Sequence, residues 1–541
     1  MTLSSNLFAS IDMGTNSFKL LIIQANQSGK FLTIDRHRNP VCLGRESSAS
    51  ISPESLLRAL NCLREFHHIL KSNDISPHRT RCVATAAIRS ADNAIDLRKA
   101  IHESTGLNVV VLSGEEEARY VYLGVLKFLP VFEKRVLVVD IGGGSTEFVI
   151  GEKGNVILGV SLNLGHVSLS QKFVRVSEIR EFVRSVIKQS GLVDKVKDCG
   201  FEKVVGTSGT IKAIEKAVFL GYGHNYSHDN EVQFGDFKRD WKFSKGELSC
   251  VVEKLCRDGE GERGRREEFF KRRSEFIIAG AVLLEEIFEL LKIEDMEVSG
   301  YALGEGVIAE TLADVFESCD LIGNGRWSSV LRLATRFSGT KIKCAAQCAN
   351  IANEIFEGLR KWMNAEGQDE INLHLDEKDL ECLEAACLLH NIGLCAGKKG
   401  YHKQTHQIIM NCDCLHGYST EEVKLIALLA RHHRKKFPKF DRSTSDLISE
   451  ESKQRFIILC VIIRISVILQ QNYSLNCKDV KVLHNHEGVQ LVFWKVLKEA
   501  NTKSGLPVRE DVEKELRKEL AHFGTVFQQP LLVEVLPCVE G

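Results

Sequence analysis

The sequence predicts an α/β protein that contains two related halves and continues into a helical domain. Two similar stretches support the duplication: "FASIDMGTNSFKLLI" at residues 8–22 and "VVDIGGGSTEFVIG" at residues 138–151. Each places an Asp-x-Gly turn between two apolar runs, so that Asp12 aligns with Asp140, and Ser17 with Ser145. After about residue 325, the pattern changes to successive amphipathic helices.

Composition and charge describe a globular chain with ample apolar core. The 541 residues are 44% hydrophobic and 26% charged, with a formal net charge of −1. Overall charge therefore predicts no specific nucleic-acid or other polyanion partner, and any anion site must be local. The 17 cysteines include no C-x-x-C pair, which favours reduced, mostly buried thiols in a cytosol-like compartment. We expect the close pairs Cys344/Cys348 and Cys412/Cys414 to be ordinary thiols rather than metal ligands.

Targeting signals are not expected. A strand at residues 8–11 leaves few residues before the fold, whereas a cleavable signal needs roughly 15–30. The longest apolar run, Phe456–Ile463, is interrupted by Arg464 and is too short to span a bilayer. We therefore expect a cytoplasmic protein with no membrane partner, and a nuclear location stays open.

The first half, residues 1–128, alternates strands and helices. Ser52 is a suitable N-cap for the helix that follows it, and the acids of "GEEEARYVYLGVLKFL" suit a helix N-terminus. In chain order, we predict strands at 7–24 and 31–43, a helix at 53–70, a short strand and helix in "RCVATAAIRSADN", the strand "NVVVLS", and the helix that starts at "GEEE".

The second half, residues 129–312, restarts the same pattern. We predict a strand–turn–strand at 136–150, the strand "NVILGVSL", and strand–turn–helix units in "KVVGTSGTIKAIEKAV" and "MEVSGYALGEGVIAETL". Residues 225–270 are polar and charged, so we predict loops and surface helix there. A mainly helical third domain is expected at 325–477. A small α+β region with three strands and one charged helix should follow at 478–541.

The repeated turn has a chemical meaning. Glycines let the backbone N–H groups, together with Ser, Thr or Asn hydroxyl and amide groups, approach an anion closely. The aspartate at each strand end would repel phosphate, so its natural partner is a metal ion or a metal-bound water. Either turn alone would be an ordinary glycine-rich hairpin. Two of them facing across a cleft favour a clamp for a polyphosphate.

Other phosphate-binding motifs do not fit. "GGGSTE" departs from G-x-G-x-x-G because Glu147 takes the place of the last glycine, and the sequence contains no G-x-x-x-x-G-K-[ST].

These turns resemble the phosphate loops of the superfamily that includes actin, sugar kinases and the 70-kilodalton heat-shock proteins. Three further stretches narrow the resemblance: "SGEEEAR" at 113–119, "DIGGGSTE" at 140–147 and "GTSGTIKA" at 206–213. Together they resemble the exopolyphosphatase/guanosine pentaphosphate phosphatase (Ppx/GppA) family over residues 7–310. The resemblance implies two actin-like (RNase H-like) domains with a cleft between them, then a helical HD-like domain.

The resemblance also implies roles for individual residues. Glu117 matches the base that deprotonates the attacking water. Asp12, Asp140 and Glu147 match acids that hold Mg²⁺ and water. In-line attack on phosphate needs charge neutralisation, a placed water and a proton acceptor. The predicted phosphate-binding residues are Asn16, Ser17, Arg89, Gly142, Gly143, Gly144, Ser145, Gly206, Ser208, Gly209 and Thr210.

Simpler explanations exist for some of these residues. Glu117 lies among three glutamates at a predicted helix start, where the helix dipole favours acids anyway. Arg89 alone would be an ordinary surface arginine. Glu147 interrupts an apolar strand, and a buried acid there is costly unless it has a function.

Two features depart from the family pattern. An arginine is common in the "LREG"-like stretch of the family, where this chain has Gly304, so a positive charge near the substrate is lost. The HD fold needs adjacent His and Asp, but this chain has His390-Asn391, and Gln347 lies near the expected place of another histidine ligand. An amide is a poor substitute for a carboxylate toward a hard cation. We therefore expect the remaining histidines to be solvated or structural: His402, His406, His432 and His433.

The predicted function is hydrolysis of phosphoanhydride bonds in inorganic polyphosphate or guanosine pentaphosphate-type nucleotides, with Mg²⁺ as cofactor. The helical domain would then cap the cleft, extend the substrate path or mediate a homodimer. "RHHRKKFPK" (residues 431–439) is either a basic track for a polyanion or a helix C-terminus that favours cations. The alternative function is a phosphate- or nucleotide-sensing regulator of the same fold that acts through protein partners. An ATP-dependent kinase is disfavoured by "SGEEEAR".

Overall fold

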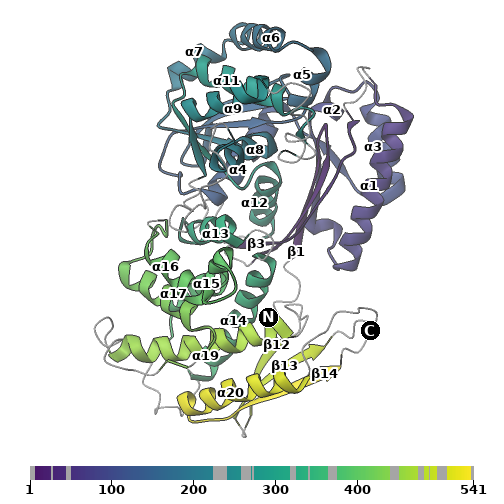
Figure 1. Cartoon of the computed structure of the whole chain (residues 1–541). Coiled ribbons are helices and arrows are strands. Elements are labelled where there is room, and N and C mark those ends of the chain that lie inside the picture. Colours follow the sequence, from purple (N-terminus) through teal and green to yellow (C-terminus); the bar gives the residue numbers. More distant parts are fainter. Residues whose placement is uncertain are drawn as a thin grey trace. The chain divides into compact units, whose positions relative to one another are not determined.

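The chain forms two compact units, residues 5–324 and residues 325–541 with 1–4. The computed structural model describes residues 7–25, 29–43, 50–222, 241–257, 270, 273–316, 325–338, 342–363, 375–412, 414–435, 437–438, 450–472, 480–485, 488–495 and 509–537. Each unit is described by itself below, with the element labels of Figure 1.

The first half of the larger unit is a five-stranded sheet in the order β3-β2-β1-β4-β5. The first three strands pair antiparallel, and β1, β4 and β5 pair parallel. Ser52 caps α1 by accepting from the Ser55 N–H, as predicted. Figure 1 shows α1 and α3 side by side against this sheet. The elements are β1 (Leu7–Met13), β2 (Phe18–Ala25), β3 (Phe31–Asn39), α1 (Pro53–Ser72), β4 (Thr80–Ala84), α2 (Ala86–Arg89), α3 (Ala94–Thr105), β5 (Val109–Val111) and α4 (Gly114–Phe128).

The second half repeats this topology. Its six-stranded sheet has the order β10-β11-β9-β6-β7-β8, in which β6, β7 and β8 pair antiparallel and β6, β9 and β11 pair parallel. The predicted duplication is thus confirmed by strand order and direction. The elements are β6 (Val136–Ile141), β7 (Thr146–Glu152), β8 (Asn155–Leu162), α5 (His166–Lys172), α6 (Val176–Gln189), α7 (Leu192–Cys199), β9 (Lys203–Thr207), α8 (Ser208–Phe219), β10 (Lys242–Ser244), α9 (Lys245–Arg257), α11 (Ile277–Leu291), β11 (Asp295–Val298) and α12 (Leu303–Val315).

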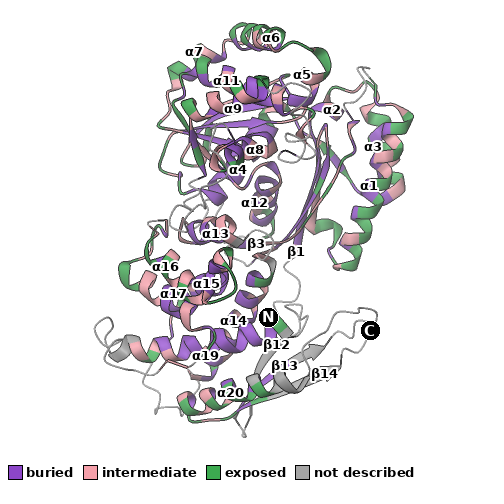
Figure 2. Cartoon of the chain, in the orientation of Figure 1, coloured by how far each residue is buried: buried purple, intermediate pink, exposed green. Residues whose placement is uncertain are grey.

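Two helices cross between the halves. α4 follows the first sheet in the sequence but packs on β6, β7 and β8, whereas α12 follows the second sheet and packs on β1, β2 and β4. The two helices also pack against each other, and both are largely buried (Figure 2). Each of these helices therefore belongs to one half by its position in the sequence, with boundaries at 128 and 312, but packs on the sheet of the other half.

The polar stretch from 225 to 270 holds more core structure than predicted. Its described part includes β10, an edge strand of the second sheet, and α9. α9 packs on α11 and buries Leu248, Val251, Val252 and Leu255. The prediction of loops and surface helix was wrong here. The apolar residues of α9 are spaced as in a buried helix, but charged residues lie between and around them, so the segment looks polar as a whole. The flanking residues 225–240 and 258–269 lie outside the described part.

The smaller unit combines helices with a short sheet. A three-stranded sheet in the order β12-β13-β14 follows the helices, and contacts of α14 with β12 and of α19 with α20 join it to them. The predicted helices and strands are all present. The elements are α13 (Gly325–Ser338), α14 (Ile342–Met363), α15 (Glu377–Leu389), α16 (Tyr401–Met410), α17 (Thr420–His432), α19 (Glu450–Asn472), β12 (Val480–Asn485), β13 (Gly488–Lys495), α20 (Arg509–Phe527) and β14 (Leu531–Pro537).

The apolar run Phe456–Ile463 lies within α19, which extends from Glu450 to Asn472. Within the described residues, Lys453–Gln471 is long and apolar enough to cross a membrane, and the bent pair Glu377–Ala396 with Tyr401–Met410 passes the same test if it counts as one span. The α19 window is 67% buried inside the protein. A buried core helix meets such a test, so length and composition are weak support for a membrane span.

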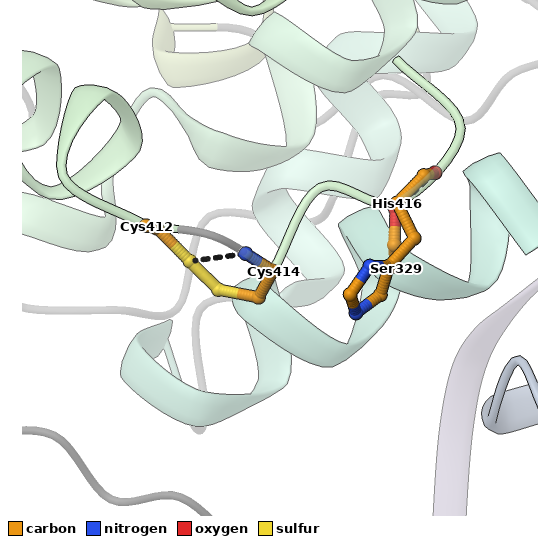
Figure 3. Close-up of a disulfide and its surroundings, with 4 residues drawn as sticks. All are labelled: Ser329, Cys412, Cys414 and His416. Atoms are coloured by element: carbon orange, nitrogen blue, oxygen red, sulfur yellow. Dashed lines mark hydrogen bonds between the residues drawn. A yellow bond between two sulfur atoms is a disulfide. The ribbon is translucent and has the colours of Figure 1, made fainter.

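One pair of cysteines departs from expectation. Cys412 and Cys414 form a disulfide, and the Cys414 N–H donates to Cys412 Sγ at 3.2 Å (Figure 3). The expectation of ordinary thiols was wrong for this pair, since the turn after α16 brings the two sulfur atoms together. Cys344 and Cys348 are free. Nearby, Ser329 Oγ contacts the His416 carbonyl oxygen at 3.4 Å.

Candidate active site

The two Asp-x-Gly turns lie at one cavity of about 370 Å³ in the larger unit. Both turns end strands that occupy equivalent places in the two sheets, which is why the duplication brings them to the same cleft. The predicted clamp is thus assembled from both halves. The predicted residues that line the cavity are Asp12, Asn16, Ser17, Glu117, Asp140, Gly142, Gly143, Gly144, Ser145, Glu147, Ser208 and Gly209.

The glycines allow the two loops to approach each other closely. A Cβ atom on Gly144 would lie 2.8 Å from Thr15 Oγ1 of the opposite loop. A Cβ atom on Gly165 would overlap the backbone of Gly143 and Gly144. Behind the glycine loop, the His166 N–H donates to the Gly142 carbonyl at 3.1 Å. A larger residue at 144 would push the two loops apart, and one at 165 would displace the glycine loop itself.

The two halves differ in the partner opposite each aspartate. Asp12 pairs across the strands with Lys19, and their side chains form an ion pair at 2.6 Å. Asp140 pairs with Glu147 at the equivalent position. Two acids directly opposite one another repel. Burial and neighbouring acids raise the pKa of both Asp140 and Glu147, although Lys19 and Ser208 oppose the shift at Asp140.

This asymmetry distinguishes the two acids that could hold a cation. Asp12 already has a lysine, whereas Asp140 and Glu147 are buried, face each other and lack an ion-pair partner among the described residues. No described group of three His, Cys, Asp or Glu side chains is arranged to hold a metal ion. Mg²⁺ commonly binds through one or two carboxylates together with substrate phosphates and water. The Asp140–Glu147 pair fits that donor set better than the predicted trio with Asp12.

Glu117 is distinguished from its two neighbouring glutamates by its environment. Glu116 completes the capping box of α4 with Ser113, and Glu115 is exposed. Glu117 is 7% exposed and lines the cavity. Burial raises the pKa of Glu117 to about 7, and Asp12 and Asp140 add to the shift, whereas Arg89 opposes it. A carboxyl group with a pKa near neutrality suits a general base.

Arg89 holds Glu117 instead of lining the cavity. Its Nη1 donates to Glu117 Oε2 at 2.8 Å and to the Leu112 carbonyl oxygen at 2.9 Å. Arg89 thereby orients the carboxylate and limits the rise in its pKa. Its predicted contact with phosphate stays a prediction.

Gly206 and Thr210 do not line the cavity either. Gly206 lies within β9, where a Cβ atom would overlap the Met296 sulfur, so it serves packing. Thr210 Oγ1 contacts His166 Nδ1 at 3.1 Å. Burial lowers the pKa of His166, which lines the cavity, to about 3, so this imidazole is neutral at physiological pH. The prediction that these two residues bind phosphate has no support in this geometry.

Two arginines that the sequence analysis missed line the same cavity, one from each half of the larger unit. Arg38 in β3 donates from Nε to Ser17 Oγ at 3.0 Å. Arg273, before α11, packs against Gly209, whose Cβ would overlap its guanidinium. Burial and the charge of Arg38 lower the pKa of Arg273 to about 10. Two positive charges beside the two glycine-rich turns could bind an anion.

Cations also lie near Gly304, where the family's arginine is missing. Lys212 donates from Nζ to the Gly300 carbonyl oxygen at 2.6 Å, and burial lowers its pKa to about 8. Arg36 pairs with Glu305 at 2.7 Å. All of them line the cavity, so loss of the arginine at 304 does not leave this end without positive charge. Lys212 lies in the "GTSGTIKA" motif, which was the available sequence signal.

The histidines of the smaller unit have structural partners. His390 is fully buried and donates from Nδ1 to the Cys387 carbonyl oxygen at 2.6 Å. His433 donates from Nδ1 to the Ala430 carbonyl oxygen, and its Nε2 accepts from the Tyr401 hydroxyl at 2.9 Å. Burial lowers the pKa of His390 to about 4. His402, His406 and His432 are only partly buried, and Gln347 is partly exposed on α14.

Comparisons with known proteins identify the family of this chain. Residues 22–314 match the Ppx/GppA phosphatase family, and residues 326–510 match domain III of the same family. An exopolyphosphatase structure from Cytophaga hutchinsonii is 23% identical, with 59% of this chain and 100% of that chain covered and a TM-score of 0.49. A family member from Aquifex aeolicus is 28% identical, with 57% and 98% covered and a TM-score of 0.47. On the strength of the family matches, this chain belongs to the Ppx/GppA phosphatase family, with duplicated actin-like domains followed by a helical C-terminal region.

Proposed function

We propose that this chain hydrolyses phosphoanhydride bonds and releases terminal phosphate from inorganic polyphosphate or guanosine pentaphosphate-type nucleotides. One observation carries the proposal: two glycine-rich turns, a buried glutamate with a pKa near 7 and two arginines share one cavity. The family assignment supports phosphatase chemistry at this site.

The residues divide the work of the reaction. The loop N–H groups and the guanidinium groups of Arg38 and Arg273 would bind phosphate oxygens and hold the substrate for in-line attack. Glu117 would accept the proton of the attacking water as the new P–O bond forms and the bridging P–O bond breaks. The products are one orthophosphate and a substrate shorter by one phosphate. Asp140 and Glu147 would hold Mg²⁺, which when bound neutralises phosphate charge.

The alternative is a sensor that binds phosphates or nucleotides and acts through protein partners. The cavity carries no observation specific to sensing. Buried, mutually repelling acids are costly to maintain in a site that only binds an anion. We therefore favour the hydrolase.

A phosphate-release assay tests the choice. Purified protein with Mg²⁺ is incubated separately with long polyphosphate, short polyphosphate, guanosine pentaphosphate and ATP. We expect release from at least one of the first three, loss of release in excess chelator, and recovery when Mg²⁺ is restored. Binding without release from any substrate would favour the sensor, and full activity in chelator would remove the metal from the mechanism.

A further inference from the structure

The smaller unit contains its own cavity, unrelated to the proposed hydrolytic cleft in the larger unit. It has a volume of about 620 Å³, within the range of small-molecule sites. Apolar and aromatic side chains form part of its wall, and the Phe437 and His522 rings stack with centroids 4.2 Å apart. The aromatic and aliphatic residues of the wall are Tyr401, Phe437, Val467, Ile468 and His522.

A buried ion pair fixes the loop at the edge of this cavity. Arg464 in α19 binds Glu519 of α20 through two hydrogen bonds of 2.7 and 2.6 Å. It also donates to the carbonyl oxygens of His432 and Lys435 at 2.7 and 2.8 Å. Lys435 has a left-handed backbone, with φ of 71°, a conformation that persists only where surrounding contacts impose it. Arg464 therefore neutralises Glu519 and positions the loop that follows α17.

Three further cations at the cavity have no such counterpart. Arg434, Lys435 and Lys518 line it and form no ion pair with a carboxylate among the described residues. Among the described residues of the lining, Glu519 is the only acid, and Arg464 already pairs with it. The positive charge also affects a neighbouring histidine. The pKa of His402 is lowered by burial and, in addition, by the charges of Arg434, Lys403, Lys435 and Arg431.

A helix C-terminus explains only part of this charge. Arg434 and Lys435 follow the end of α17, where the helix dipole favours cations. Lys518 lies in the middle of α20, so its position at the same cavity is not explained by a helix end. Cations from two separate elements converge on one cavity with an aromatic and aliphatic wall.

We propose that this cavity binds a small phosphate-bearing anion through Arg434, Lys435 and Lys518. Two sources share this chemistry: short inorganic phosphate chains, and nucleotides whose base would pack on the wall of Phe437, Val467 and Ile468. The smaller unit would then bind a ligand of its own, although the net charge of the whole chain predicts no polyanion partner.

Isothermal titration calorimetry on the full chain tests the proposal. The probes are imidodiphosphate and the β,γ-imido analogue of guanosine triphosphate, titrated in chelator so that binding is observed without hydrolysis. The test variant is Lys435→Glu with Lys518→Glu. The matched control is Lys398→Glu with Lys399→Glu, which makes the same charge change at exposed lysines outside the cavity. Arg273→Ala is included to weaken binding in the cleft of the larger unit, so that binding there can be distinguished from binding in the cavity of the smaller unit.

We expect the wild type, the control variant and Arg273→Ala to keep a binding event that the test variant weakens by about tenfold or more. Affinity for both probes would identify a site for phosphate alone, and affinity for the nucleotide analogue alone would assign a role to the apolar wall. Thermal unfolding checks folding, and Lys518→Glu alone replaces the double variant if that variant is unstable. Equal binding by the test and control variants, or no binding event beyond the cleft, would overturn the proposal.

Discussion

Glu115 and Glu117 lie two residues apart at the start of α4, yet only Glu117 is buried in the cavity. Glu117→Gln keeps the shape of the side chain and its contact with Arg89 but cannot accept a proton. We expect turnover to fall by about 10²–10⁴, while substrate affinity holds or rises because one negative charge is lost. Steady-state kinetics of phosphate release measures both effects.

Glu115→Gln is the matched control. Its carboxylate is exposed and interacts with the helix dipole, worth about 0.3–1 kcal/mol, so turnover should change little. If Glu115→Gln proved as damaging as Glu117→Gln, the assignment of the base within the three glutamates would be wrong.

The environment of Glu117 also predicts a change in stability with pH. Its pKa is about 7 in the folded protein and about 4.3 in an unfolded chain. Between these values, the folded state binds more protons, so this group makes the wild type less stable as pH rises. Glu117→Gln removes the effect. In metal-free buffer, we expect the variant to be more stable than the wild type by about 1–3 kcal/mol above pH 7.

Denaturant unfolding at several pH values measures this difference. The advantage of Glu117→Gln should grow from about pH 4.3 to pH 7 and vanish at lower pH, where both states are protonated. An advantage that is independent of pH would show that the carboxylate is not the cause. Loss of the charge on Glu117 would thus stabilise the fold and lower turnover.

At the scale of elements, the crossing of α4 and α12 holds the two halves together. A Cβ atom on Gly306 would overlap the Tyr120 backbone, and one on Gly124 would overlap the Ala302 backbone. Glu310 of α12 accepts hydrogen bonds from Arg119 and Tyr120 of α4. Close approach of the helices therefore positions Glu117 on α4 relative to both sheets.

Gly306→Ala should disturb this crossing. Because the overlapping atoms belong to backbone, the helices must separate, and we expect a loss of about 1–3 kcal/mol of folding free energy together with reduced turnover. Gly246→Ala in α9 is the control, since nothing lies within 4 Å of its added methyl group. That change should stabilise the helix by about 0.5–1 kcal/mol. Equal effects of the two changes would contradict the role of the crossing.

At the scale of the molecule, the hydrolytic site belongs to one unit. Every residue that lines the cleft cavity lies within residues 10–305, inside the larger unit. The buried histidines of the smaller unit bind backbone carbonyls or Tyr401. Among the residues that the structure describes, all groups proposed for the chemistry therefore lie in the larger unit.

His390→Ala tests this division. His390 is fully buried and contacts the His433 ring, with centroids 4.9 Å apart. We expect the variant to unfold at a lower temperature, by roughly 2–4 °C per kcal/mol lost in a domain of this size, with turnover on short polyphosphate largely kept. A fall in turnover of more than about a hundredfold with the fold intact, the scale of a catalytic group, would reveal a second reaction site.

The sequence by itself predicted the two related halves, the turn residues and the acid at 117. Strand and helix patterns, and the repeated Asp-x-Gly turn, depend on residues that are close together in the sequence. They can therefore be recognised without knowledge of the tertiary structure. Motif resemblance supplied the roles of Glu117, Asp140 and Glu147. It also predicted phosphate contacts for Arg89, Gly206 and Thr210, which stay predictions; in the structure these residues contact Glu117, lie within β9 and contact His166, respectively.

Only the tertiary structure decided which charges meet. Lys19 and Glu147 occupy equivalent positions after the two turns, but strand pairing is what sets one against Asp12 and the other against Asp140. Arg38 and Arg273 are 235 residues apart in the sequence, yet both line one cavity, and the charge of Arg38 lowers the pKa of Arg273. Electrostatic interaction depends on distance in space and on burial, and neither quantity is present in the local pattern of a sequence.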